Sequence, residues 1–425
     1  MRPNLFKTCS IAIFLFACFL APQASGYSVL SHEAIIDAAW DAAIKPILLQ
    51  RFPDASEDDL RKAHAYAYGG AIIQDMGYYP FGSHLFSDLV HYVRSGDFIL
   101  NEIADAQDLN EYAFALGSLA HYAADNIGHP VATNLAVPML YPKVRKKFGR
   151  VATYEDNPTD HLKAEFSFDV AEVAEHRYAP QGYHDFIGFE VSKPLLERAF
   201  LKTYGVPLKD VASTIDLSLG SYRRSVASVI PEMTKVAWQA KKKELMQAAP
   251  GLTKRKFVYA LARSSYEKEW GANYGKPGFW ARFLAFLFEI VPKVGPFKAL
   301  GFNAPTPATQ KLFMDSFVSS LKLYQGQLTL IAGKEALTLV DTNFDTGKPS
   351  KFGEYKLADE ACAKLLIKLQ DHKPEGVDAD LRKSLLDFYG SNAPADPKAA
   401  AALAQLRNQP VPAAVAPLNG AAPEL

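Results

Sequence analysis

The hydrophobic pattern of this chain is that of helices. Apolar residues recur at intervals of three and four, as in 110–127 and 207–238, and this spacing gathers them on one face of a helix. Few segments alternate as strands do, and neither internal repeats nor coiled-coil heptads are found. The pattern predicts an all-α fold, a multi-helix bundle with additional C-terminal helices.

The start of the chain departs from this pattern. Arg2 and Lys7 give a positive beginning, residues 11–20 form an apolar run, and residues 24–26 are small. These are the features of a secretory signal peptide over residues 1–26, and the apolar run is too short to span a bilayer comfortably. We therefore expect a secreted or periplasmic protein.

We expect the mature chain to have three parts. Residues 27–190 form a helical core, for which the candidate ligands described below predict metal binding and catalysis. Residues 191–390 stay helix-like with few candidate ligands, as a C-terminal extension packed on that core. Residues 391–425 are rich in Ala and Pro, which predicts a disordered tail.

Charge and cysteine content argue against several classes of protein. Lys plus Arg and Asp plus Glu both number 46, so loss of the signal leaves 44 against 46, a net charge of −2 with no basic surplus for nucleic acid. Cys9 and Cys18 leave with the signal and Cys362 stays alone, which excludes an internal disulfide.

Residues 15–18 faintly resemble a lipoprotein-processing site, although Phe16 fits it poorly. The sequence motifs of serine hydrolases, P-loop enzymes, dinucleotide-binding domains and H-E-x-x-H metalloproteases are missing.

The most informative stretch is 116–130. His121, Asp125 and His129 are spaced at i, i+4 and i+8, and so form a polar stripe on an otherwise apolar helix. Buried polar groups are costly unless satisfied, and two imidazoles with a carboxylate are well satisfied by a metal ion. Pro130 disfavours helical dihedrals at His129. We therefore expect His129 just past the helix end, directed at a second ion.

Further candidate ligands are scattered between positions 32 and 165. Taken singly, each has an ordinary structural explanation, such as a surface histidine, a helix cap or an exposed i,i+4 pair. Taken together, nitrogen and oxygen ligands without cysteine favour zinc in a hydrolytic site over a structural zinc ribbon. These candidates are His32 in the first turn after the helix cap Ser31, Asp75, His84 or His91, and the pair His161 and Glu165.

In their order and context, these motifs resemble the zinc-dependent phospholipase C family. Its superfamily includes the fungal single-strand-specific zinc nucleases and the animal glycosylphosphatidylinositol-specific phospholipase D. The resemblance covers residues 27–170 through six short motifs. It implies an all-α bundle holding three Zn²⁺ ions.

The resemblance also implies a ligand set. The N-terminal amine and carbonyl of Tyr27, with His32, would bind one zinc; Asp75, His84, His121 and Asp125 a second, with Asp125 bridging; and His129, His161 and Glu165 the third.

Several site residues are assigned by context. Ser83-His84 in its aromatic surroundings matches the family motif better than His91 does, so His84 ranks above His91 as a ligand. Asp75 is the candidate catalytic residue, orienting water or acting as a base. The candidates for substrate binding are His91, Tyr78 and Tyr79.

The function that we expect is hydrolysis of phospholipids by attack of a metal-activated hydroxide on phosphorus, in the manner of a phospholipase C. The three-residue spacer between Asp125 and His129 is similar to that of the D-type enzyme and leaves the cleaved bond open. A zinc nuclease and a non-catalytic, metal-stabilised binding protein are the alternatives. The aromatic stretch 279–288 is a candidate membrane contact; no nucleic-acid partner is expected, and no oligomeric state is indicated.

Overall fold

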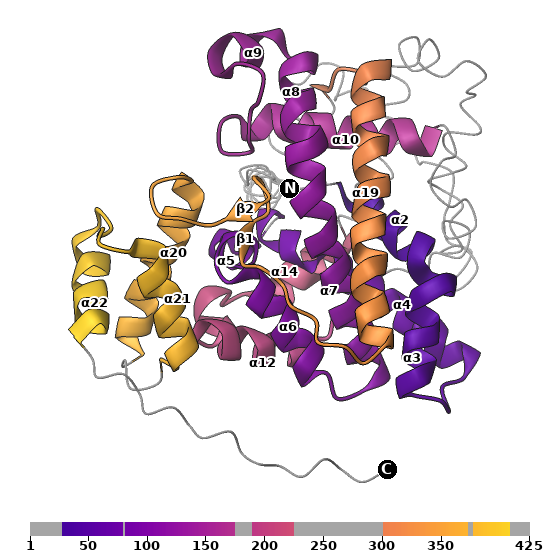
Figure 1. The fold of residues 1–425 in the computed structure, drawn as a ribbon, viewed down its shortest axis with the longest axis horizontal. Helices are drawn as coiled ribbons and strands as arrows, with labels where there is room; N and C mark the ends of the chain where they lie inside the picture. The colour runs from indigo at the N-terminus through magenta and orange to yellow at the C-terminus, as the bar shows by residue number, and fades with distance from the viewer. Residues whose placement is uncertain (1–27, 80, 175–188, 225–300, 373–376, 409–425) are drawn as a thin grey trace, which may run out of the picture.

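The structure is a computed structural model that describes residues 28–79, 81–174, 189–224, 301–372 and 377–408 (Figure 1). The signal peptide, Tyr27, the stretch 279–288 and the tail beyond 408 lie outside the described residues. The described secondary structure is almost entirely helical, which confirms the all-α prediction. Among the described helices, none is long and apolar enough to cross a bilayer.

The N-terminal half contributes the helices that hold the candidate ligands. In chain order these are α2 Val29–Ala39, the π-helical turn η1 Trp40–Ile44, α3 Lys45–Arg51, α4 Glu57–Ile72, the 3₁₀ helix η2 Ile73–Tyr78, α5 His84–Tyr92, α6 Ser95–Asp105, α7 Leu109–Gly128, the π-helical turn η3 His129–Thr133, α8 Asn134–Leu140, α9 Pro142–Phe148 and α10 Pro158–Ala174.

The C-terminal half adds helices and one small hairpin. They are α12 Lys193–Tyr204, α13 Leu208–Val211, α14 Ile215–Arg224, α19 Pro307–Ala332, strands β1 Thr342–Asn343 and β2 Lys348–Pro349, α20 Lys356–Asp371, α21 Ala379–Tyr389 and α22 Pro397–Asn408.

Helix α7 is the centre of the bundle. The cap residue Asp108 accepts a hydrogen bond from the Glu111 backbone N–H at 2.9 Å, and the helix is buried along most of its length. It packs against α4, α19, α6 and α2, and α19 runs beside it in Figure 1. The ligand stripe of α7 is therefore enclosed by other helices.

Two helical segments continue through residues that often end a helix. Helix α4 runs through Gly69 and Gly70 to Ile72, and these glycines allow close packing, because a Cβ on Gly70 would lie 1.9 Å from the Phe114 carbonyl oxygen of α7. Pro130 does not end the helical run after α7. The π-helical turn η3 follows directly and leads into α8, so that His129 keeps helical dihedrals of φ −63° and ψ −61°.

The described C-terminal helices pack on the N-terminal ones. Helix α12 lies against α6 and α20 against α5, while α20, α21 and α22 gather on one side of the molecule (Figure 1). The prediction of a disordered tail from residue 391 is wrong for 397–408. There, Ala399, Ala402, Leu403 and Leu406 form a helical stripe that is buried, and α22 packs on α20.

The hairpin β1–β2 is the one sheet of the described chain, and it folds back onto the centre. Thr342 pairs with Pro349 and Asn343 with Lys348. The backbone N–H of Phe344 donates to the His91 carbonyl at 3.1 Å, and the Thr342 hydroxyl donates to Asn126 Oδ1 at 2.6 Å. The hairpin therefore lies against α5 and α7, next to the candidate ligands.

Candidate metal centre

Three groups of buried side chains have the composition and spacing of metal sites. Within each group, the possible ligand atoms lie within 4.8 Å of one another. His121 belongs to two of the groups, and His129 of the third group lies beside Asp125 of the first, so the three sites are neighbours in one cluster. The groups are His32, His121 and Asp125; Asp75, His91 and His121; and His129, His161 and Glu165.

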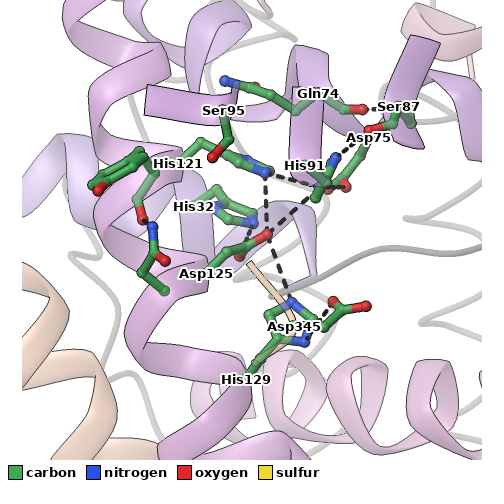
Figure 2. A network of polar contacts seen from close by, with 12 residues as sticks. His32, Gln74, Asp75, Ser87, His91, Ser95, His121, Asp125, His129 and Asp345 are labelled. Atoms are coloured by element: carbon green, nitrogen blue, oxygen red, sulfur yellow. Dashed lines mark hydrogen bonds and ion pairs between the residues drawn. The ribbon is translucent and has the colours of Figure 1, made fainter. Parts of the chain in front are cut away.

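Asp125 lies at the centre of the cluster (Figure 2). Its Oδ2 is 3.1 Å from His121 Nε2, 3.6 Å from His129 Nε2 and 3.7 Å from His91 Nε2. Its Oδ1 is 3.4 Å from His32 Nε2. This carboxylate faces four imidazoles from α2, α5, α7 and η3, and its placement suits a ligand shared between ions.

The hydrogen bonds of His91 and His121 orient both rings so that their other nitrogen atoms can bind a cation. His91 Nδ1 donates to the Ser87 carbonyl and His121 Nδ1 to the Ala71 carbonyl, each at 2.8 Å. In the neutral rings, the single proton is held on Nδ1 and each Nε2 carries a lone pair that can bind a cation. These two atoms face each other at 3.3 Å, an arrangement that a positive ion between them would satisfy.

The third group brings together helix α10 and the end of α7. His161 Nε2 lies 2.7 Å from Glu165 Oε1 and 3.1 Å from His129 Nδ1. Oε2 of Glu165 is buried and meets no hydrogen-bond donor among the described residues. The structure thus brings together the three residues that the sequence analysis assigned to one ion. His129 belongs to this group through Nδ1 and also lies beside Asp125 through Nε2.

The ranking of His84 above His91 is corrected by the structure. His84 is the first residue of α5 and is exposed, whereas His91, two turns later, is buried beside Asp75 with Nε2 3.4 Å from its Oδ1. The resemblance of Ser83-His84 to the family motif favoured His84, and Tyr78 does contact its ring, at 5.7 Å between centroids. The packing of α5 against its neighbours, which local sequence does not reveal, buries His91 and leaves His84 at the surface.

Asp345 is a member of the site that the ligand search along the sequence missed. The carboxylate is buried on the β1–β2 hairpin, with Oδ1 3.4 Å from His129 Nδ1. Tyr92 donates to its Oδ2 at 3.0 Å, and the Tyr355 hydroxyl donates to the same oxygen. The turn-rich sequence of residues 343–355 could have pointed to Asp345, but this residue lies about 180 residues beyond the last ligand motif.

Two tyrosines lie between the second and third ligand groups and contact a histidine of each. The Tyr78 ring lies 5.8 Å from the ring of His91 and 6.0 Å from that of Tyr154, which in turn lies 5.8 Å from His161. The candidate Tyr78 is thus beside the cluster, and Tyr154 was not foreseen. Tyr79 packs instead on Tyr222 of α14, with 4.3 Å between ring centroids.

Burial sets the electrostatics of the cluster. It raises the pKa of Glu165 well above its usual value, with Asp125 adding repulsion, and it lowers the pKa of His32 to about 3. Burial also lowers the pKa of His121, but the adjacent Asp125 outweighs it and raises the value to about 9. The cluster gathers buried acids and bases that compete for protons, and bound cations would stabilise all the carboxylates in their charged form.

The start of α2 is held in place by α10. Asp169 accepts hydrogen bonds from Ser31 Oγ at 2.6 Å and from the backbone N–H of Leu30 at 3.1 Å. This buried carboxylate caps the first turn of α2 from another helix and so positions His32. Tyr27, the predicted N-terminal ligand, lies outside the described residues.

Comparison with known protein families gives a match for part of the chain. Residues 31–214 match the family model described as zinc dependent phospholipase C. Searches of curated proteins and of solved structures found no match. The matched region contains all three buried ligand groups, and it ends before the hairpin that contributes Asp345. Residues 31–214 of this chain therefore match the zinc-dependent phospholipase C family.

Proposed function

We propose that this protein is a secreted, zinc-dependent phosphodiesterase that cleaves phospholipids in the manner of a phospholipase C. The observation that carries the proposal is the cluster of three buried nitrogen and oxygen groups inside the segment that matches the family. Such donor sets, without cysteine, suit catalytic zinc. Export is supported by the signal-like residues 1–26.

The residues of the three groups would hold the metal. When bound there, zinc supplies the Lewis acidity that activates water near neutral pH and neutralises charge on phosphoryl oxygens. The carbonyls of Ala71 and Ser87 hold the protons of His121 and His91 on Nδ1, which leaves both Nε2 atoms available.

The other residues of the site have roles that follow from their protonation. Burial raises the pKa of Tyr78 well above its usual value and raises that of Tyr154 as well, so both phenols keep their protons and can donate to a phosphoryl oxygen. Asp75 lies next to His91, with the two side chains 3.4 Å apart, which supports a role in orienting the attacking water or accepting its proton.

The test uses the mature protein, with zinc measured by elemental analysis. We expect zinc-dependent release of diacylglycerol and phosphocholine from phosphatidylcholine, lost with chelator and restored by zinc. Release of phosphatidic acid would show D-type cleavage. Cleavage of single-stranded DNA without lipid cleavage would make the protein a nuclease, and retained zinc without any turnover would make it a binding protein; either result refutes the proposal.

The N-terminal ligand is tested separately. A variant with one residue added before Tyr27 should lose one zinc, because the amine would no longer lie at its position five residues before His32. Mature protein carrying Tyr27→Phe keeps the amine and carbonyl and is the matched control. Full zinc content in the extended variant would remove the amine from the ligand set.

A further inference from the structure

Helices α8 and α9 form a hairpin with its own small core. The chain turns at Tyr141 and returns after α9, so that the backbone N–H of Ala152 donates to the Asn134 carbonyl at 3.0 Å. Val137 and Val144 pack together inside it. We call residues 134–151 the basic hairpin; α9 lies at the top edge of the molecule in Figure 1.

The basic hairpin carries a concentrated positive charge. Between Asn126 and Tyr154 the sequence contains no Asp or Glu, whereas the mature chain as a whole is slightly acidic. All the Lys and Arg side chains of the hairpin are exposed, and none forms an ion pair with another described residue. They are Lys143, Arg145, Lys146, Lys147 and Arg150. Unneutralised cations at this density attract an anionic surface.

Exposed apolar side chains accompany these cations. Val131, Leu135 and Met139 follow one another at i, i+4 and i+8 along η3 and α8, with Val131 40% and Met139 42% exposed, and Leu135 half-buried. Val151, at the end of the hairpin, is 49% exposed. Apolar side chains gain free energy at a lipid interface, and not along the phosphates of a nucleic acid.

The basic hairpin connects the elements that build the third ligand group. The turn η3, which begins at His129, directly precedes it, and α10, which carries His161 and Glu165, packs against α8. A lipid surface bound by the hairpin would therefore be separated from the third ligand group only by helices α8 and α10. We propose that the basic hairpin docks the protein on an anionic phospholipid surface, with the cations on the headgroups and the apolar side chains in the interface.

This proposal rests on a phospholipid substrate, so its test separates docking from catalysis. The charge variant K143Q/R145Q/K146Q/K147Q is compared with a control, K62Q/K322Q/K334Q/K398Q, that removes four exposed lysines spread over other surfaces. Sedimentation measures binding to vesicles of phosphatidylcholine alone or with phosphatidylglycerol, at low and high salt. Activity is measured on a water-soluble, short-chain phosphatidylcholine.

We expect roughly tenfold or greater loss of binding to the anionic vesicles for the charge variant and little change for the control. Wild-type binding should fall with salt, because exposed charges are screened. A second variant, M139S/V151S, should weaken binding at both salt concentrations. All variants should keep wild-type activity on the soluble substrate, which shows that they are folded.

The outcomes distinguish the two proposals. If the soluble substrate is cleaved and the charge variant binds anionic vesicles as well as the control does, docking by the hairpin is refuted. Preferential, charge-dependent binding of single-stranded DNA over anionic vesicles also refutes it. If no phospholipid is cleaved but vesicle binding depends on the hairpin as described, the proposed function fails and the docking surface stands.

Discussion

Replacing His91 by alanine tests the metal centre most directly, because His84 on the same helix provides a matched control. His91 is buried with Nε2 3.3 Å from His121 Nε2 and 3.4 Å from Asp75 Oδ1, whereas His84 is exposed at the start of α5. His91→Ala removes one of three side chains from its ligand group. His84→Ala removes none.

The size of the effect has a lower bound. Loss of a side chain that only supports a metal ligand costs about 10- to 100-fold in metal affinity, or about 1.4–2.8 kcal/mol at 1.4 kcal/mol per factor of ten. Loss of a ligand should exceed this range. We therefore expect His91→Ala to lose at least one zinc after dialysis against buffered zinc, together with phosphodiesterase activity.

The assay combines elemental analysis, turnover of phosphatidylcholine and thermal unfolding of the zinc-free proteins. Zinc-free His91→Ala and wild type should both unfold cooperatively, so that the loss of metal is not due to misfolding. His84→Ala should keep its zinc and its activity. Full zinc content in His91→Ala, with loss in His84→Ala, would show that the arrangement of α5 described above is not the one that binds metal.

Three further predictions concern the scaffold. Gly117→Ala places a Cβ 2.0 Å from the Ala67 carbonyl oxygen and should destabilise the fold by about 1–3 kcal/mol in urea unfolding, whereas Gly326→Ala, with nothing within 4 Å, should stabilise α19 by up to about 1 kcal/mol; equal effects would contradict the close packing. Burial raises the pKa of Glu102 from 4.5 to about 8, so the folded state holds more protons than the unfolded chain in that window and stability falls as pH rises through it. Glu102→Gln should flatten this pH dependence and add at most about 5 kcal/mol at pH 8 and above; an unchanged pH profile would refute this. Asp169→Ala should remove the hydrogen bonds that Ser31 Oγ and the Leu30 backbone N–H donate to this carboxylate, cost about 1–3 kcal/mol and lower zinc content, and retention of full zinc would show that α2 is positioned without Asp169.

Local sequence was sufficient to predict contacts between ligands that are spaced at i,i+4 on one helix. The i,i+4 spacings of His121 with Asp125 and of His161 with Glu165 place each pair on one helix face whatever surrounds the helix, and the structure has both contacts, at 3.1 and 2.7 Å. Local spacing failed at His84 and His91, because each is compatible with the helix and only the packing of α5 decides which one faces inward.

The sequence by itself determined the helical class, the kind of ligands and most of their positions, because periodicity and side-chain chemistry are properties of short segments. Tertiary structure alone decided that His91 enters the cluster, that Asp345 reaches His129 across more than 200 residues, and that α4 and η3 continue through glycine and proline. The physical reason is that these outcomes depend on which helices pack together: the apolar periodicity of a segment marks the face that is buried but does not specify which distant segment covers it.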